Sequence, residues 1–92
     1  MEPVEAALEL QGELESALED ESAGAVIRVL AVRPPPDLGA DRVFRVILAL
    51  PGSRDWTVDL PVPLAMGYLA DEEAAVNEWK GWVLELVARL GL

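Results

Sequence analysis

Three stretches of strand-like composition follow one another through the middle of the chain, and they limit the folds that are open to it. They are residues 25–33 (AVIRVLAVR), 42–50 (RVFRVILAL) and 54–60 (RDWTVDL), rich in β-branched and aromatic residues. Three prolines at 34–36 separate the first stretch from the second, and the Pro-Gly-Ser of 51–53 is a tight-turn pattern before the third. We therefore expect three strands in an antiparallel meander.

Segments with helical spacing lie on either side of these strands. Residues 3–21 begin with Pro3, which suits the first position of a helix, and residues 71–90 begin with Asp71, a favourable N-cap residue. At about 100° per residue, each segment gathers apolar side chains on one side. In the first segment these are Val4, Ala7, Leu8, Leu10, Leu14 and Leu18; in the second they are Val76, Trp79, Val83, Leu86, Val87 and Leu90.

The order of these elements predicts one α+β domain over residues 1–92, arranged α-β-β-β-α. The simplest packing places both helices on one face of a three-stranded antiparallel sheet. Pro61 and Pro63 are expected to end the third strand, so residues 64–70 are predicted to form an irregular connection.

Two of the predicted strands are apolar on both faces. Phe44, Val46 and Leu48 are expected to face the helices, yet the opposite side of the same strand also carries apolar residues. An antiparallel sheet with one wet face normally alternates apolar and polar side chains, so a second copy of the chain is expected to cover the outer face. The predicted self-association surface comprises Val26, Arg28, Leu30, Val32, Val43, Arg45 and Ile47, together with Trp82 at the margin of the last helix.

Charge is concentrated at the start of the chain. Eight of the first 22 residues are acidic and none is basic, and the formal net charge of the whole chain is −10. One interpretation is a solvated face that supplies solubility. The other is a surface for a basic protein, including mimicry of a nucleic acid. The carboxylates predicted to form this partner-binding surface include Glu5, Glu9, Glu13 and Asp20.

The α-β-β-β-α order resembles that of the double-stranded-RNA-binding domain, in topology alone. In that family the last helix begins with lysines that contact phosphates, whereas this chain has Asp71, Glu72 and Glu73 there. Direct binding of nucleic acid is therefore not expected, because phosphate contacts need clustered Lys and Arg.

The composition argues against catalysis. The chain contains no cysteine and no histidine, so the usual thiolate and imidazole nucleophiles, bases and metal ligands are missing. We expect no enzyme activity, no cofactor and no metal. Arg28 and Arg45, in mid-strand positions, are expected to pair with Asp55 or Asp59, either in a surface network or buried at a dimer interface.

No apolar run reaches a membrane-spanning length, and the acidic start is unlike a signal peptide, so a soluble, cytoplasmic protein is expected. Gln11 and Asn77 are the only side-chain amides, a usage typical of thermophiles and of high-GC genomes. The leading hypothesis is a non-catalytic interaction or accessory protein that forms a homodimer. The alternative is an acidic regulator or nucleic-acid mimic that binds a basic protein through its first helix.

Overall fold

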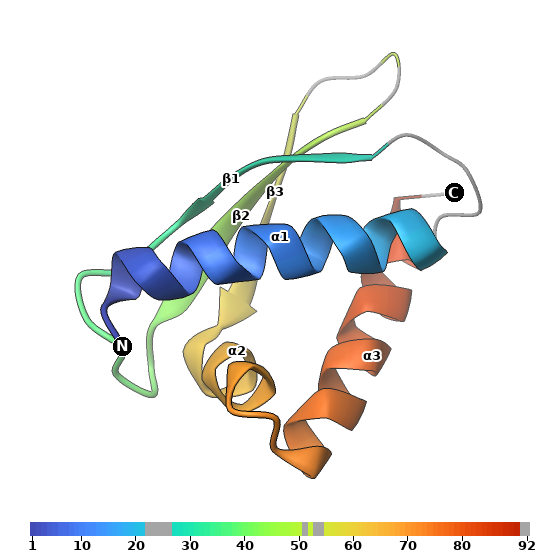
Figure 1. Cartoon of the computed structure of the whole chain (residues 1–92). Helices are drawn as coiled ribbons and strands as arrows, with labels where there is room; N and C mark the ends of the chain where they lie inside the picture. The colour runs from blue at the N-terminus through green and yellow to red at the C-terminus, as the bar shows by residue number, and fades with distance from the viewer. Residues whose placement is uncertain (22–26, 51, 53–54, 91–92) are drawn as a thin grey trace.

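A computed structural model describes residues 1–21, 27–50, 52 and 55–90, and it confirms an α+β fold built on an antiparallel meander (Figure 1). The order is α-β-β-β-α-α, with one helix more than predicted. The elements are α1 (Pro3–Glu21), β1 (Arg28–Arg33), β2 (Val43–Ala49), β3 (Trp56–Pro61), α2 (Val62–Leu69) and α3 (Glu73–Arg89). The predicted strand positions 25, 26 and 54 lie outside the described residues.

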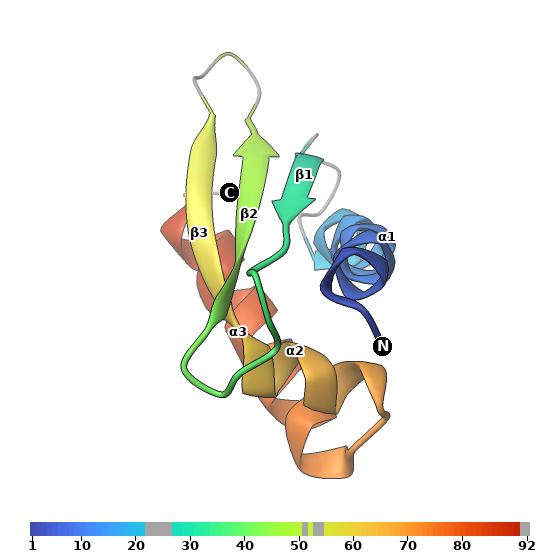
Figure 2. The ribbon, with the colours of Figure 1, turned by 90° about the vertical axis from the view of Figure 1, so that its left-hand side faces the viewer.

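The sheet has the order β1-β2-β3, and the core lies on one of its faces. In Figure 2, α1 lies beside β1 and α3 lies behind β2 and β3. Phe44, Val46 and Leu48 of β2 are fully buried, as the alternation predicts, and Leu60 of β3 pairs with Phe44 and is also buried. The hydrophobic pattern of the central strand therefore fixes which face receives the helices.

A β-bulge in β1 overturns one assignment made from strict alternation. Val29 pairs with Leu48 and Ala31 with Ile47, so Leu30 is an extra residue on this strand. One extra residue reverses the alternation that follows it, and Val32 consequently returns to the core face, where it is buried. The prediction that Val32 belongs to the outer face was therefore wrong.

Helix α1 buries a narrower stripe than predicted. Val4 and Leu8 are 60% and 68% exposed, so their assignment to the buried side was wrong. The buried stripe is centred near Leu10 and Leu14, and Leu8 lies about 120° around the helix from Leu14. The residues that α1 does bury are Ala6, Ala7, Leu10, Leu14 and Leu18.

The segment predicted as an irregular connection is the helix α2. Pro63 occupies one of its first two positions, where a missing N–H costs no intrahelical bond. Asp71, predicted as the N-cap of the last helix, instead follows the end of α2 with a φ of 59°. The N–H of Asp71 donates to the Tyr68 carbonyl and that of Glu72 to the Gly67 carbonyl, both at 3.0 Å, which is a Schellman ending. Glu72 is the N-cap of α3.

Candidate functional site

The described residues hold no group of three or more acidic side chains placed to bind a metal ion. Within the same ranges, no buried side-chain nitrogen or oxygen lacks a hydrogen-bond partner. No helix in this part of the chain is long and apolar enough to cross a membrane. Four surface features of the described residues are candidates for a function.

The outer sheet face carries most of the predicted self-association surface. Leu30 is 48% exposed and Val43 is also exposed. Ile47 is half-buried beside Ala31, and Arg45 lies between Ile47 and Val43 on this face of β2. Arg28 and Arg45 are exposed on the same face, whereas Val26 lies outside the described residues. Apart from Val32 and Trp82, the described members of this set share one face of the sheet.

Arg45 forms the ion pair that its position in the strand predicts. Its Nε lies 3.6 Å from Oδ1 of Asp59, the residue that it faces in the β2–β3 register. Both side chains are more than half exposed in the single chain, where such a pair contributes about 0–1 kcal/mol.

The acidic face of α1 is exposed along its length. Glu5, Glu9, Glu13 and Asp20 are all exposed, as predicted. The three ion pairs among the described residues lie elsewhere: Arg42–Asp37, Arg45–Asp59 and Arg89–Glu85. None of these three pairs involves α1, although Lys80 of α3 lines a hollow together with Glu13, Asp20 and Glu21.

One hydrogen bond ties the acidic face to α2. The hydroxyl of Tyr68 donates to Oε2 of Glu13 at 2.8 Å, and the Tyr68 ring stacks on Trp79 with the ring centroids 3.9 Å apart. Burial, followed by the hydrogen bond to Glu13 and the Glu13 charge, raises the pKa of Tyr68 to about 12. Tyr68 therefore acts as a neutral donor that anchors α1 at neutral pH.

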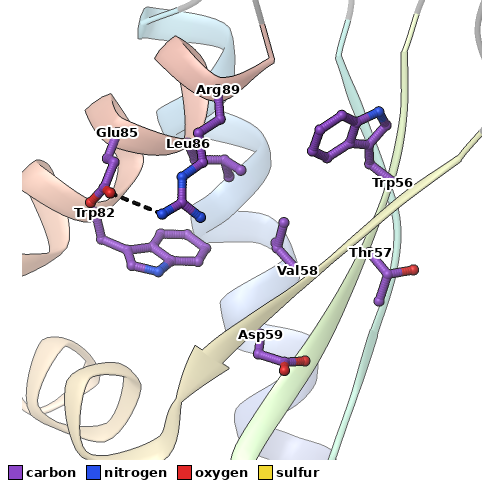
Figure 3. Close-up of a pocket in the computed structure, with 8 residues that line it drawn as sticks. All are labelled: Trp56, Thr57, Val58, Asp59, Trp82, Glu85, Leu86 and Arg89. Carbon is purple, nitrogen blue, oxygen red and sulfur yellow. Dashed lines mark hydrogen bonds and ion pairs between the residues drawn. The ribbon is translucent and has the colours of Figure 1, made fainter.

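A groove between β3 and α3 is the feature that sequence reasoning missed. It has a volume of about 430 Å³, and its lining is mixed: four residues are apolar (Trp56, Val58, Trp82 and Leu86) and four are polar or charged (Thr57, Asp59, Glu85 and Arg89). Figure 3 shows Trp56 and Val58 on the strand opposite Trp82 and Leu86 on the helix. Trp82 is half-buried, as expected, but it lies on the helix-covered side of the sheet and not on the outer face with Val43. Two features of the sequence could have indicated this groove: the apolar face of the third strand and the position of Trp82 at the margin of the apolar side of the last helix.

The groove runs beside the free edge of β3. The N–H of Val62 donates to the Arg42 carbonyl at 3.0 Å, and these two residues continue the β2–β3 register by one pair beyond Val43 and Pro61. Hydrogen-bonded pairs alternate along an antiparallel ladder, so the backbone N–H and C=O groups of Leu60, Val58 and Trp56 also point toward β2. The residues between them, Thr57, Asp59 and Pro61, direct their backbone groups away from β2, toward the outside of the sheet. Pro61, which has no N–H, fits an outward position. Within the described residues no hydrogen bond reaches these outward groups.

The opposite edge of the sheet, on β1, is partly covered. The Gln11 side chain of α1 donates from Nε2 to the Val29 carbonyl at 3.4 Å. The bulge at Leu30 and the arginines at the two ends of β1 add features that discourage strand pairing. The two edges therefore differ in how accessible their backbone groups are.

Comparison with protein-family models, curated proteins and solved structures finds no match for this chain. The four surfaces with distinct chemistry are the outer sheet face, the acidic face of α1, the β3–α3 groove and the β3 edge.

Proposed function

We propose that the chain is a non-catalytic interaction module that self-associates through the outer face of its sheet. The observation that carries this proposal is the uncovered apolar set on that face, Leu30, Val43 and Ile47. The helices bury only the other face, and a symmetric partner would remove the apolar set from water at about 25 cal/mol per Å². The exposed Arg45–Asp59 pair on this face would fix the register of the two copies.

Sedimentation equilibrium at micromolar concentrations tests this proposal. A dimer of the 9.9 kDa chain is expected, and Leu30→Asp should shift it to monomer. Leu84→Asp is the matched control, because Leu84 is equally large and exposed but lies on α3. A monomer at all micromolar concentrations, or equal effects of the two substitutions, would contradict self-association through this face.

A second function is favoured by the exposed carboxylates of α1, which outnumber the nearby base Lys80. On this proposal the helix binds a basic surface on another protein, acting as an acidic regulator. The like-charged pairs Glu5–Glu9 and Glu9–Glu13 each cost a few tenths of a kcal/mol in the free helix, so a basic partner would relieve them.

An oligolysine peptide is a suitable probe of this second function. Its binding should weaken steeply with added salt and should be lost when Glu5, Glu9 and Glu13 become Gln. The control replaces Asp41 by Asn and Glu72 and Glu73 by Gln, which removes the same charge from positions outside α1. Equal losses in the two triple variants would indicate a net-charge effect and would contradict a site on α1.

A further inference from the structure

The β3 edge presents backbone groups at the spacing that an added strand requires. Thr57 and Asp59 each direct one N–H and one C=O outward, and Pro61 adds a C=O, as the Val62–Arg42 bond and the β2–β3 register establish. Outward groups on alternate residues of an edge strand form a template for a further strand. Thr57 and Asp59 therefore offer both a donor and an acceptor to an added strand, and Pro61 offers an acceptor.

The groove supplies contacts for side chains on one face of such a strand. Side chains of an added strand would alternate between the outer sheet side and the helix side. Those on the helix side would enter the groove between Val58 and Trp82, beside Trp56, which is 40% exposed. An apolar side chain at every second position of the added strand would therefore contact Trp56, Val58 and Trp82, with the Glu85–Arg89 pair at the helix side of the groove.

The surroundings of the edge and groove carry acidic groups. Asp59 lies on the outer side of β3, where it faces the intervening positions of an added strand. Glu85 lines the groove, and a second hollow that shares Trp82 and Glu85 with it is also lined by Glu78. Arg89 also lines the groove, where it pairs with Glu85 at 3.1 Å, and Asp59 pairs with Arg45 at 3.6 Å. Glu78 beside the groove and Asp55 directly before β3 leave the surroundings of this edge with more acidic than basic groups, and this excess favours basic residues in the ligand.

We propose that the β3 edge and the β3–α3 groove bind an extended segment of a partner protein that alternates apolar residues with Lys or Arg. The segment pairs with Thr57 and Asp59 as a fourth strand, and its apolar side chains occupy the groove. A second copy of β3 is a poorer occupant, because it would bring two more carboxylates, Asp55 and Asp59, to an edge that is already acidic. This binding does not depend on self-association through the outer sheet face.

The probe is a synthetic hexapeptide of alternating Lys and Val with blocked ends. Binding is followed by amide hydrogen exchange on the full chain, since pairing should slow exchange at Thr57 and Asp59 specifically. Two further peptides test the geometry. In the first, the residues whose N–H groups point toward β3 are N-methylated; in the second, the residues between them are. Only the first should lose affinity, by about tenfold or more.

Two substitutions test the protein side. Thr57→Pro removes an outward N–H without removing a bond to β2, and it should weaken binding by about tenfold. Thr57→Val, the matched control, keeps that N–H and should bind the peptide as the parent chain does. Leu30→Asp on the outer sheet face should leave peptide affinity unchanged, which separates this inference from the proposed self-association.

Slowed exchange at Thr57 and Asp59, together with opposite behaviour of the two N-methylated peptides, would support the proposal. No slowing at about 1 mM peptide, the weak end of measurable affinity, would overturn it. A peptide of the same composition with its valines grouped together should bind more weakly than the alternating peptide. Equal binding of the two would indicate charge attraction alone and would also overturn the proposal. Slowing that rises with protein concentration in the absence of peptide would identify a second copy as the occupant and overturn the choice of partner.

Discussion

The two edges of this small sheet differ in how accessible their backbone N–H and C=O groups are. The β1 edge is bulged at Leu30, lies beside α1 and receives a hydrogen bond from Gln11 at the Val29 carbonyl. The β3 edge is regular from Trp56 to Pro61 and directs the backbone groups of Thr57 and Asp59 away from β2. Soluble proteins normally blunt an edge that would attract other strands. The β1 edge is thus covered by α1 and bulged, whereas β3 has only Asp59 and Pro61 to discourage pairing and keeps the outward groups of Thr57 and Asp59 accessible.

The largest expected effect concerns the anchoring of α1 beside β1. Leu14 is 0% exposed on the core side of α1, and Leu14→Ala should lower the free energy of unfolding by about 2–5 kcal/mol. Urea denaturation measures this loss. Leu8→Ala, on the exposed side of the same helix, should change stability by no more than about 0.5 kcal/mol. Similar losses at the two positions would contradict the burial of α1 on the protected side.

The next effect sharpens the assignment of inward and outward groups on β3. Val58→Pro removes an N–H directed at the Val46 carbonyl and should cost about 1–3 kcal/mol. Thr57→Pro removes an outward N–H and should cost less than about 1 kcal/mol. If Thr57→Pro proved the more damaging in urea denaturation, the outward direction assigned to Thr57 would be wrong.

A smaller effect is expected for the side chain that covers the β1 edge. Gln11→Ala removes the hydrogen bond to the Val29 carbonyl and should cost about 0.5–1.5 kcal/mol in urea denaturation. Ser16→Ala, at an exposed position on the same helix, is the control. A variant as stable as the parent chain would show that Gln11 contributes nothing to the protection of β1.

The smallest effect appears only at high pH. The pKa of Tyr68 rises from 10.0 to about 12 on folding, so the stability that it contributes is complete below pH 10 and is lost as the pH rises toward 12. Urea midpoints measured across this window should fall more steeply for the parent chain than for Tyr68→Phe. Glu13→Gln should remove only part of the difference, because burial is the largest cause of the shift. Identical slopes in the parent and Tyr68→Phe would contradict the anchoring role of Tyr68.

The sequence predicted the elements whose periodicity is strong. The leucines of α1, the alternation of Phe44, Val46 and Leu48, and the spacing from Trp79 to Leu86 each place an apolar stripe against the core. Helix α2 was missed because it is short and apolar all round, so it has no periodicity to detect. Its prolines suggested the end of regular structure, although a helix accepts proline in its first turn.

The candidate sites were less predictable because they depend on tertiary geometry. The bulge at Leu30 reverses the faces of β1, and both faces are apolar enough that the sequence fits either register. The groove depends on how α3 crosses the sheet, since Trp56 and Trp82 are far apart in sequence and meet only across that space. The acidic face of α1 was predictable, because every carboxylate that forms it lies on one continuous helix.

β3 offers an open edge, and native-state amide hydrogen exchange of the free chain is the measurement that tests this most directly. Val58 and Leu60, whose N–H groups are directed at β2, should exchange slowly, whereas Thr57 and Asp59 should exchange rapidly. Slow and rapid exchange are thus expected to alternate along this one strand. Slow exchange at all four amides in a chain shown to be monomeric would contradict it, because the outward groups of β3 would then be paired within the fold.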